Sequence, residues 1–559
     1  MKRSVRSARR LVAAAAAAAV LATAACSAPV KTQTDAGAGA GTGGSGGTAT
    51  SMLIAADNGS PTFDRNFNPF SSGKRNTTTY IYEPLVIINE MSGEETPWLA
   101  TGYTQPDPKT VDFAIRSGVT WSDGKPFTAA DVLYTFNLLK KYPQLDLKGI
   151  WSHMASAEVK GDHVVVHLSS ADVPAAKIIA QQLIVPEHLW KDVKDPVTWT
   201  DEKPVGTGPY TLGDFTPNQY TLVKNTSYWQ ADKVAADTLV QPASNSELDL
   251  VNKGYDWAYA FMSDVDKTWV KADPKHNTYW FPAGATIALI PNMTKKPYDD
   301  VNFRAGVAYA LDKQQIADKA EQGYVKKASQ TGLMLPAQEK ILDSSIPNQG
   351  YVDPDATKAL AAFAKAGYTQ KGGKLVDASG KQLSISITTP NGWSDWLQGV
   401  QQVKTQLGKI GVAVKVVQPQ PAAYQQELRS GEFDMIMGTV GGSGQPYQDY
   451  NGLMGKEFYA PIGKTASGNF GRFQSPEADA LLAKLKTTVD QDAQNQLVSQ
   501  LEQITYDQFP MISLFYGGSW GLFSTKKFTG WPSADDAYAS PKTWDSTPLL
   551  ILTHLKAVG

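Results

Sequence analysis

Apolar and polar positions alternate most regularly between residues 383 and 417. In the predicted strand 383–389 apolar and polar side chains take turns, which is the two-residue period of a strand with one buried face. The spacing then lengthens to three and four residues, which predicts a helix from about Ser394 that ends at Gly411. The apolar residues of this helix stand at positions 396, 397, 400, 403, 407 and 410. Residues 412–416 return to the strand period, so strand, helix and strand follow one another.

The same alternation of strands and helices extends over the second half of the chain. Helical periodicity recurs between residues 303 and 311, and residues 433–440 are a further predicted strand. This order predicts an α/β fold. In open α/β sheets, ligands bind just beyond the carboxyl ends of the strands. We therefore expect the loops 388–395 and 438–446, which follow two of these strands, to face one crevice.

The first 25 residues have the pattern of an export signal. Five basic residues precede an apolar run from Leu11 to Ala25, which is too short to be a good membrane span. The arginine pair at positions 9 and 10 leaves the twin-arginine route open beside the general secretory route. We expect an extracytoplasmic protein, in the periplasmic space or at the cell surface.

The only cysteine of the chain, Cys26, directly follows this leader. A single exported thiol cannot form an internal disulfide. The sequence LATAAC resembles a bacterial lipoprotein cleavage site, although Thr23 stands where leucine is most usual. We expect Cys26 to be lipidated and to anchor the protein to the cell membrane without spanning it. An ordinary secretory signal with an incidental cysteine is the alternative. We expect residues 26–50 to comprise the lipidated cysteine and a flexible linker after the leader.

Composition limits the classes of function further. The chain has 559 residues, 42% of them hydrophobic, which is enough for two or three lobes. It carries 52 basic and 54 acidic residues, and five of the basic ones lie in the leader, so the mature chain has a formal net charge of −7. No basic surface for nucleic acid is indicated. With six histidines, no HExxH motif and no Cys/His cluster, the sequence predicts neither a metal site nor another cofactor.

Five segments of the mature chain occur in the order and spacing of a known family. They are FAIRSGVTWSDGKPFTAADVLYTF (113–136), PVGTGPYTL (204–212), LVKNTSYW (222–229), VNFRAGVAYALDKQQI (301–316) and YVDPDATKALAAFAKAGY (351–368). With them the chain resembles the extracytoplasmic solute-binding proteins of ABC importers, in the dipeptide and oligopeptide-binding family, family 5. The first segment also has a physical reading, because Thr128 can cap a helix that contains Asp131 three residues later.

The resemblance implies an α/β fold with mixed sheets, arranged as a three-domain hinged clamshell like the type II periplasmic binding proteins. Its lobes close around a solute and present it to permease subunits, while ATP is hydrolysed on other subunits. A monomer without enzymatic activity is therefore expected. The family pattern gives 51–82, 204–293 and 519–559 for a discontinuous domain I, 83–203 for domain II and 294–518 for domain III.

The resemblance also bears on the ligand. Peptide-binding members commonly have a Trp-x-Gly-Asp type segment after the strand that matches 433–440, and its aspartate pairs with the peptide ammonium. Here Thr439 stands at the tryptophan position and Gly442 at the aspartate position. An ammonium group buried without a partner is strongly destabilising. A free peptide amino terminus is therefore disfavoured, unless Asp449 or another acid substitutes.

Four aromatic segments look more like the subgroup of this family that binds short β-linked oligosaccharides such as cellobiose or mannobiose. They are NFNPF (66–70), YIYEPL (80–85), TPWLATGY (96–103) and NGWSDW (391–396). Sugars present apolar C–H faces rimmed by hydroxyls, and tryptophan offers a broad apolar face together with a hydrogen-bond donor. We therefore favour an uncharged oligosaccharide over an oligopeptide as the ligand.

Ten residues are candidates for ligand contact. Trp393 is the leading platform for a sugar ring, and its alternative is packing of the loop against a helix. Trp396 shares a helix stripe with Val400, so a core role is open for it too. The other candidates follow strand-like runs, lie near a predicted domain entry, share the Trp393 loop or take the place of the missing aspartate: Trp257, Phe261, Trp520, Asn68, Phe70, Asn391, Asp395 and Gly442. For these, packing or local turn hydrogen bonds are the alternative.

Three classes of function remain open. The first is a solute-binding lipoprotein that delivers its ligand to an ABC permease. The second is an exported carbohydrate-active enzyme, which would need two carboxylates roughly 5–10 Å apart across the scissile bond. No such pair can be recognised in the sequence. The third is a signalling or scaffold lipoprotein that has kept the fold and lost the ligand. We favour the first class.

Overall fold

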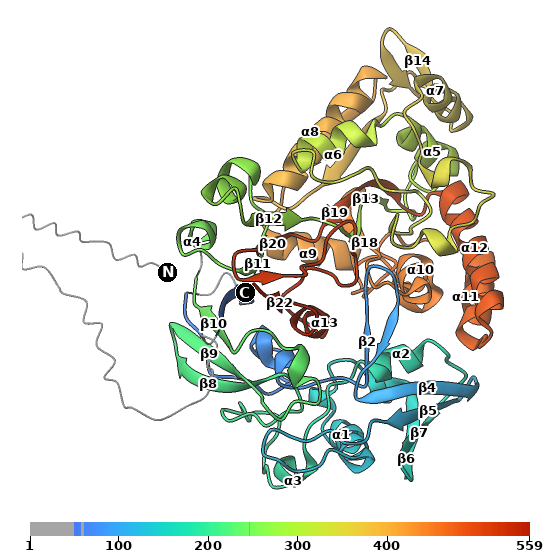
Figure 1. The fold of residues 1–559 in the computed structure, drawn as a ribbon. Coiled ribbons are helices and arrows are strands. Elements are labelled where there is room, and N and C mark those ends of the chain that lie inside the picture. Colours follow the sequence, from blue (N-terminus) through green and yellow to red (C-terminus); the bar gives the residue numbers. More distant parts are fainter. Residues whose placement is uncertain (1–49, 58–60, 245, 559) are drawn as a thin grey trace, which may run out of the picture. The chain divides into compact units, whose positions relative to one another are not determined.

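The computed structural model of the protein describes residues 50–57, 61–244 and 246–558 (Figure 1). The predicted leader, Cys26 and the linker up to residue 49 lie outside the described residues. Helices and strands alternate along the described chain and form mixed sheets, which confirms the predicted α/β class. None of the described helices combines the length and the apolar content that crossing a bilayer requires.

The largest sheet has seven strands and gathers three distant parts of the chain. Its strand order is β12-β20-β11-β1-β10-β9-β8. Strand β1 pairs in parallel with both β10 and β11, and the other pairs are antiparallel. The strands are β1 (Ser51–Ala55), β8 (Tyr210–Thr216), β9 (Gln219–Lys224), β10 (Thr238–Pro242), β11 (Trp257–Tyr259), β12 (Asn277–Trp280) and β20 (Gly521–Ser524). All seven fall in the segments expected to form domain I.

An antiparallel sheet of four strands lies between residues 100 and 168, in the order β4-β5-β7-β6. Its elements and their neighbours are β4 (Ala100–Asp107), β5 (Thr110–Ile115), β6 (Met154–Lys160), β7 (His163–Leu168), α1 (Ala129–Lys141), α2 (Ala175–Ala180) and α3 (Glu187–Trp190). Helix α1 begins as predicted. The Thr128 backbone N–H donates to the Asp131 carboxylate at 2.9 Å, and the two residues form a capping box.

A short hairpin precedes this sheet in the chain. It consists of β2 (Val86–Ile88) and β3 (Glu95–Pro97), paired antiparallel. All three residues of β2 are buried, which fixes the base of the hairpin against the rest of the chain. Its turn reaches the loop before α10 (Figure 1).

The third large sheet has five strands in the order β17-β16-β18-β13-β19. Its strands are β13 (Ala283–Pro291), β16 (Ser384–Thr388), β17 (Ala413–Val417), β18 (Met435–Val440) and β19 (Ile512–Gly518). The helices of this part of the chain are α5 (Val301–Tyr309), α6 (Lys313–Ala320), α7 (Ala356–Lys365), α8 (Ser394–Lys409), α9 (Pro421–Ser430), α10 (Pro446–Met454), α11 (Pro476–Thr487) and α12 (Gln491–Gln508). The run β16-α8-β17 confirms the strand, helix and strand predicted for 383–417.

Strand β13 belongs to the five-stranded sheet. The family pattern places residues 283–291 in domain I, whereas β13 pairs along its length with β18 and β19 in the five-stranded sheet. The last six of its nine residues are buried.

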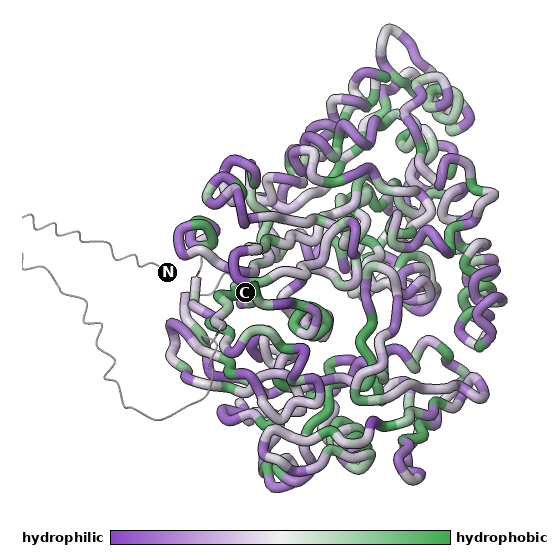
Figure 2. The backbone as a smooth tube through the Cα atoms, viewed as in Figure 1, coloured by the Kyte–Doolittle hydropathy of each residue, from purple (hydrophilic) through white to green (hydrophobic). Residues whose placement is uncertain are grey.

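Shorter elements complete the described chain: α4 (Glu247–Asn252), α13 (Pro548–Leu552), β14 (Thr369–Lys371), β15 (Lys374–Val376), β21 (Phe528–Thr529) and β22 (Lys556–Ala557). Hydrophobic positions are frequent in α13 and β2, and hydrophilic positions are frequent along α11 and α12 (Figure 2). Strand β2 borders the cavity described next through Ile88, and Thr547, the residue before α13, lines it too.

Candidate functional site

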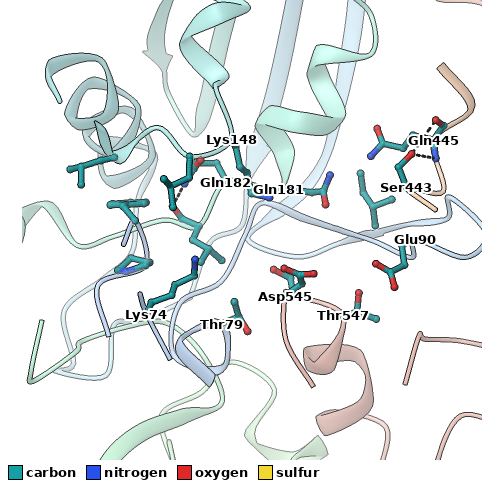
Figure 3. Close-up of a pocket in the computed structure, with 17 residues that line it drawn as sticks. Lys74, Thr79, Glu90, Lys148, Gln181, Gln182, Ser443, Gln445, Asp545 and Thr547 are labelled. Carbon is teal, nitrogen blue, oxygen red and sulfur yellow. Dashed lines mark hydrogen bonds between the residues drawn. The ribbon is translucent and has the colours of Figure 1, made fainter. Parts of the chain in front are cut away.

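A cavity of about 380 Å³ opens where distant parts of the chain meet (Figure 3). Its walls come from residues 69–90, the loop after α1, residues 181–183, the loop between β18 and α10, and the loop before α13. Four charged side chains line it, and we call it the charged cavity: Lys74, Glu90, Lys148 and Asp545. Its size is within the range of small-molecule sites in proteins.

The charged side chains stand on turns that the neighbouring elements hold in place. Lys74 ends a turn in which its backbone N–H donates to Ser71 at 3.3 Å. Lys148 lies in a turn closed by the Gly149 N–H, which donates to the Asp146 carbonyl at 3.0 Å. Asp545 has a φ of +63°, a left-handed conformation that is uncommon outside glycine. These turns direct side chains from three segments toward one cavity.

The two lysines share one nearby acid. Burial lowers the pKa of the Lys148 ammonium, and the negative charge of Asp545 opposes that shift. The pKa of Lys74 is also lowered, first by burial, with Asp545 raising it and Lys148 lowering it further. Solvent still reaches the Lys148 side chain, so its ammonium lies inside an open cavity rather than in the core. Among the described residues, neither lysine has a hydrogen-bond or ion-pair partner at bonding distance.

Glu90 occupies the turn of the hairpin and lines the cavity. Its Oε2 accepts from the Lys542 ammonium at 2.5 Å. Its Oε1 is buried and has no hydrogen-bond partner in the described part of the chain. In Figure 3, Glu90 lies near Ser443 and Gln445, Lys74 lies on the other side of Asp545, and Lys148 lies beside Gln181 and Gln182. The cavity therefore has a basic end and an end with an acid and an amide.

The loop after β18 has a glycine, Gly442, at the position where peptide-binding relatives are expected to carry an aspartate. Gly442 has a φ of +96°, and a Cβ there would lie 2.5 Å from the Gly284 carbonyl oxygen. No residue with a side chain fits without a shift of the backbone. Asp449 is engaged locally, since it accepts from the Ser443 backbone N–H at 3.1 Å, and burial raises its pKa to about 6.

A second cavity of about 300 Å³ shares Gln445 with the first and lies beside the same hairpin. Amide and tyrosine side chains line it together with apolar ones, and we call it the amide cavity after the former: Tyr103, Gln105, Gln445, Tyr447, Gln491, Gln494 and Asn495. An ion pair between Lys177 and Glu95, at 2.9 Å, neutralises the two charges at its wall.

The loop that carries the leading sequence candidates lies elsewhere in the fold. Trp393 precedes α8, is 39% exposed, and its ring meets that of Trp396 edge-on at 4.9 Å. Trp396 is 6% exposed and belongs to the core beneath α8. Burial raises the pKa of Asp395, and the Asn391 backbone N–H donates to Pro419 at 2.8 Å. None of these four lines the charged cavity or the amide cavity.

Two further candidates are enclosed by protein. The Trp257 side chain is fully buried, and its indole N–H donates to the Pro541 carbonyl at 3.1 Å. The Asn68 amide is fully buried and donates to the backbone carbonyls of Pro196 and Trp199. Both side chains pack inside the protein and use their polar atoms in internal hydrogen bonds. Neither is exposed to a ligand in this structure.

Three candidates lie at or near surfaces that a ligand can reach. Phe70 lines the charged cavity and packs edge-on against Trp190 at 5.3 Å. Phe261 and Trp520, far apart in sequence, meet at 4.9 Å, and Trp520 also meets Phe281 at 4.9 Å. All three rings of this second group are half-buried. The structure thus brings together two residues that were selected separately.

The charged residues of the cavity were missed by the reading of the sequence. Lys74, Lys148 and Asp545 stand in loops of mixed composition, outside the matched family segments and without a motif. The one nearby signal was NFNPF, which ends at Phe70. Their convergence depends on the packing of segments more than 400 residues apart.

Comparison with known proteins gives the family. Residues 94–459 match the model described as bacterial extracellular solute-binding proteins, family 5 Middle. The chain is 26% identical to di/tripeptide-binding protein 1 of Pseudomonas aeruginosa (strain UCBPP-PA14) over 452 residues, which cover 74% of this chain and 79% of that protein. It is 25% identical to the oligopeptide-binding protein OppA of Bacillus subtilis (strain 168) over 492 residues, or 82% and 86% of the two chains.

A solved structure supports the same assignment. The periplasmic oligopeptide-binding protein of an oligopeptide ABC transporter from Thermotoga maritima matches with a TM-score of 0.79 and 26% identity, over 91% of this chain and 99% of that one. Its mannohexaose-bound form matches with a TM-score of 0.71 and 26% identity, over 92% and 99%. The chain therefore belongs to family 5 of the bacterial extracellular solute-binding proteins, the substrate-binding components of ABC importers.

Proposed function

We propose that the protein captures short peptides in the charged cavity and delivers them to an ABC permease. Charged side chains of both signs inside one cavity carry this proposal. The two relatives compared above are named for di- and tripeptides and for oligopeptides, which supports peptides over the oligosaccharide favoured from the sequence.

The charges of the cavity suit a zwitterionic ligand. A short peptide brings a carboxylate, an ammonium group and a row of amides, and each class of group finds partners in the lining. An uncharged sugar would displace water from Lys74 and Lys148 without returning a charge. Partly desolvated ions without a partner are destabilising, so the cavity favours the charged ligand.

An uncharged oligosaccharide is the second candidate. The Thermotoga maritima protein has been solved with mannohexaose bound, and the amide cavity offers the amides and tyrosines that hydroxyl groups prefer. Trp393, with its exposed ring, remains a predicted platform for this ligand. The reading as a carbohydrate-active enzyme has no support from the relatives, which are named as binding proteins.

The remaining features of the proposal follow from the sequence. Cys26 would carry lipid and tether the protein to the outer face of the membrane as a monomer. The chain would form three domains in two lobes that close around the peptide, with the boundary of the first domain moved to about residue 282 because β13 pairs with β18 and β19. Closure would remove water from the charged cavity and strengthen its electrostatic contacts.

Native mass spectrometry of the purified protein tests the ligand class. One sample receives a mixture of tri- to pentapeptides, and another receives mannobiose, cellobiose and mannohexaose. We expect saturable complexes with peptides and none with the sugars. Complexes with the sugars alone would reject the peptide and establish the second candidate.

A further inference from the structure

The basic end of the charged cavity has more positive than negative charge. Asp545 acts on both Lys74 and Lys148, whereas Glu90 is already paired with Lys542 through its Oε2. One carboxylate therefore faces two ammonium groups. Neither lysine is bonded to a partner within the described chain.

The opposite side of the site lacks a fixed acid in the loop after β18. Gly442 has no room for a side chain beside Gly284, and the Asp449 carboxylate, in the first turn of α10, accepts from the Ser443 backbone N–H. Recognition of a charged peptide end through this loop would therefore be weak. The unbonded charges are concentrated at the lysines instead.

We propose that Lys74 and Lys148 form a subsite for the C-terminal carboxylate of the bound peptide. This inference rests on the proposed function and adds an orientation to it. The carboxyl end of the peptide lies at the lysines, and the chain runs toward Glu90, Ser443 and Gln445, which lie beyond Asp545 in Figure 3.

The chemistry of the two lysines explains why this end of the cavity would prefer a carboxylate. An ammonium group partly removed from water has lost hydration, and a carboxylate restores it with charge-assisted hydrogen bonds. Asp545 repels the carboxylate of the peptide, but the two lysines supply two positive charges, one for Asp545 and one for the peptide carboxylate. Phe70 and Leu183 add apolar surface to the lining of the same cavity.

Two matched peptide libraries test the subsite on the full-length protein. Both contain tri- to pentapeptides; one has free C-termini and the other has C-terminal amides. Native mass spectrometry ranks the binders, and calorimetry on the tightest free peptide and its amide gives the dissociation constants. We expect the amide to bind about 10- to 100-fold more weakly, the range for a hydrogen bond to a charged group.

Variants locate the effect. Lys74→Gln and Lys148→Gln should each weaken the free peptide by about 10-fold or more, and the double variant should bind free and amidated peptides alike. Lys404→Gln, at an exposed lysine of α8, is the matched control and should bind as the parent does. Melting temperatures equal to that of the parent show that the variants are folded.

The outcomes separate this inference from the proposed function. If free and amidated peptides bind equally to the parent protein, the carboxylate subsite is rejected while peptide capture stands. If amidated peptides that contain Asp or Glu bind as tightly as free ones and depend on the lysines, the C-terminal assignment is rejected. If neither library binds, the proposed function fails, and the subsite fails with it.

Discussion

The backbone of Gly444 lies directly against the carbonyl oxygen of Glu90: a Cβ at residue 444 would lie 2.5 Å from that oxygen. Gly93, in the same hairpin turn, approaches the Gly444 carbonyl equally closely. The backbones of the hairpin turn and of the loop before α10 thus lie in close contact. This contact sets the spacing between Glu90 on one side of the charged cavity and Ser443 and Gln445 on the other.

Replacing Gly444 by valine should disrupt this spacing. The side chain would meet the Glu90 carbonyl, and the φ of +69° at this position is unfavourable for a residue with a Cβ. Strain of this kind costs about 1–3 kcal/mol, and we expect peptide affinity to fall by a similar amount. Calorimetry measures the affinity. Gly452→Ala, in α10 and with open space around the new methyl group, is the control; equal affinities in both variants would show that the contact does not support binding.

The two tryptophans of the α8 region should respond differently to alanine. Trp396 is buried in the core beneath α8, so Trp396→Ala should lower the free energy of unfolding by about 3–5 kcal/mol. Trp393 is more exposed, so Trp393→Ala should cost less stability and leave peptide affinity unchanged, because the ring does not line the charged cavity. Denaturant unfolding and calorimetry test both points. A large loss of ligand affinity in Trp393→Ala would restore the tryptophan platform.

Stability should decline between pH 4.5 and about 7 because of a buried acid. Burial raises the pKa of Glu83 from 4.5 to about 7, although its Oε1 accepts hydrogen bonds from the Trp98 indole at 2.5 Å and the Tyr228 hydroxyl at 2.9 Å. The folded protein therefore holds a proton that the unfolded chain releases above pH 4.5. Below pH 4.5 this protonated acid makes its full contribution to the free energy of unfolding, about 3 kcal/mol. The contribution is lost as the pH rises through 7.

Glu83→Gln replaces the ionisable carboxyl group with an amide, so the stability of the variant should change little between pH 4.5 and 7. The amide oxygen can still accept from both donors, so the variant should be more stable than the parent at pH 8 and similar at pH 4. Thermal unfolding followed by circular dichroism across this range measures the difference. A parent and a variant with parallel profiles would show that Glu83 is ionised in the folded protein.

Membrane attachment should depend on Cys26. If its thiol carries the lipid, Cys26→Ser should move the protein from the membrane fraction to the soluble extracytoplasmic fraction. Immunoblotting of the fractions, with metabolic labelling by a fatty acid, records the change. Retention of the serine variant in the membrane fraction would point to another mode of attachment.

Local structure was predictable where one element determines its own pattern. The alternation in 383–389, the stripe from Trp396 and the cap at Thr128 depend on neighbours within a few residues, and all three are present in the structure. Trp257 shows the limit of such reasoning. It follows a polar turn in the sequence, but its ring is buried against Trp531, about 270 residues away.

The site was harder to predict than the fold. Lys74, Lys148 and Asp545 share no motif, and their common cavity exists only because distant loops are packed together. The absence of an aspartate at 442 was visible in the sequence, and it argued against peptides only while no other charged group was known. The lysines do not replace that aspartate, because they would hold the carboxylate of the peptide and not its ammonium group; they offer a charged anchor at the other end of the ligand.

A crystal structure of the protein with its tightest-binding peptide tests the central claim most directly. We predict peptide density in the charged cavity, with the C-terminal carboxylate within hydrogen-bond distance of the Lys74 and Lys148 ammonium groups. Peptide density elsewhere, such as against Phe261 and Trp520 or on Trp393, with the charged cavity filled only by water, would contradict the account.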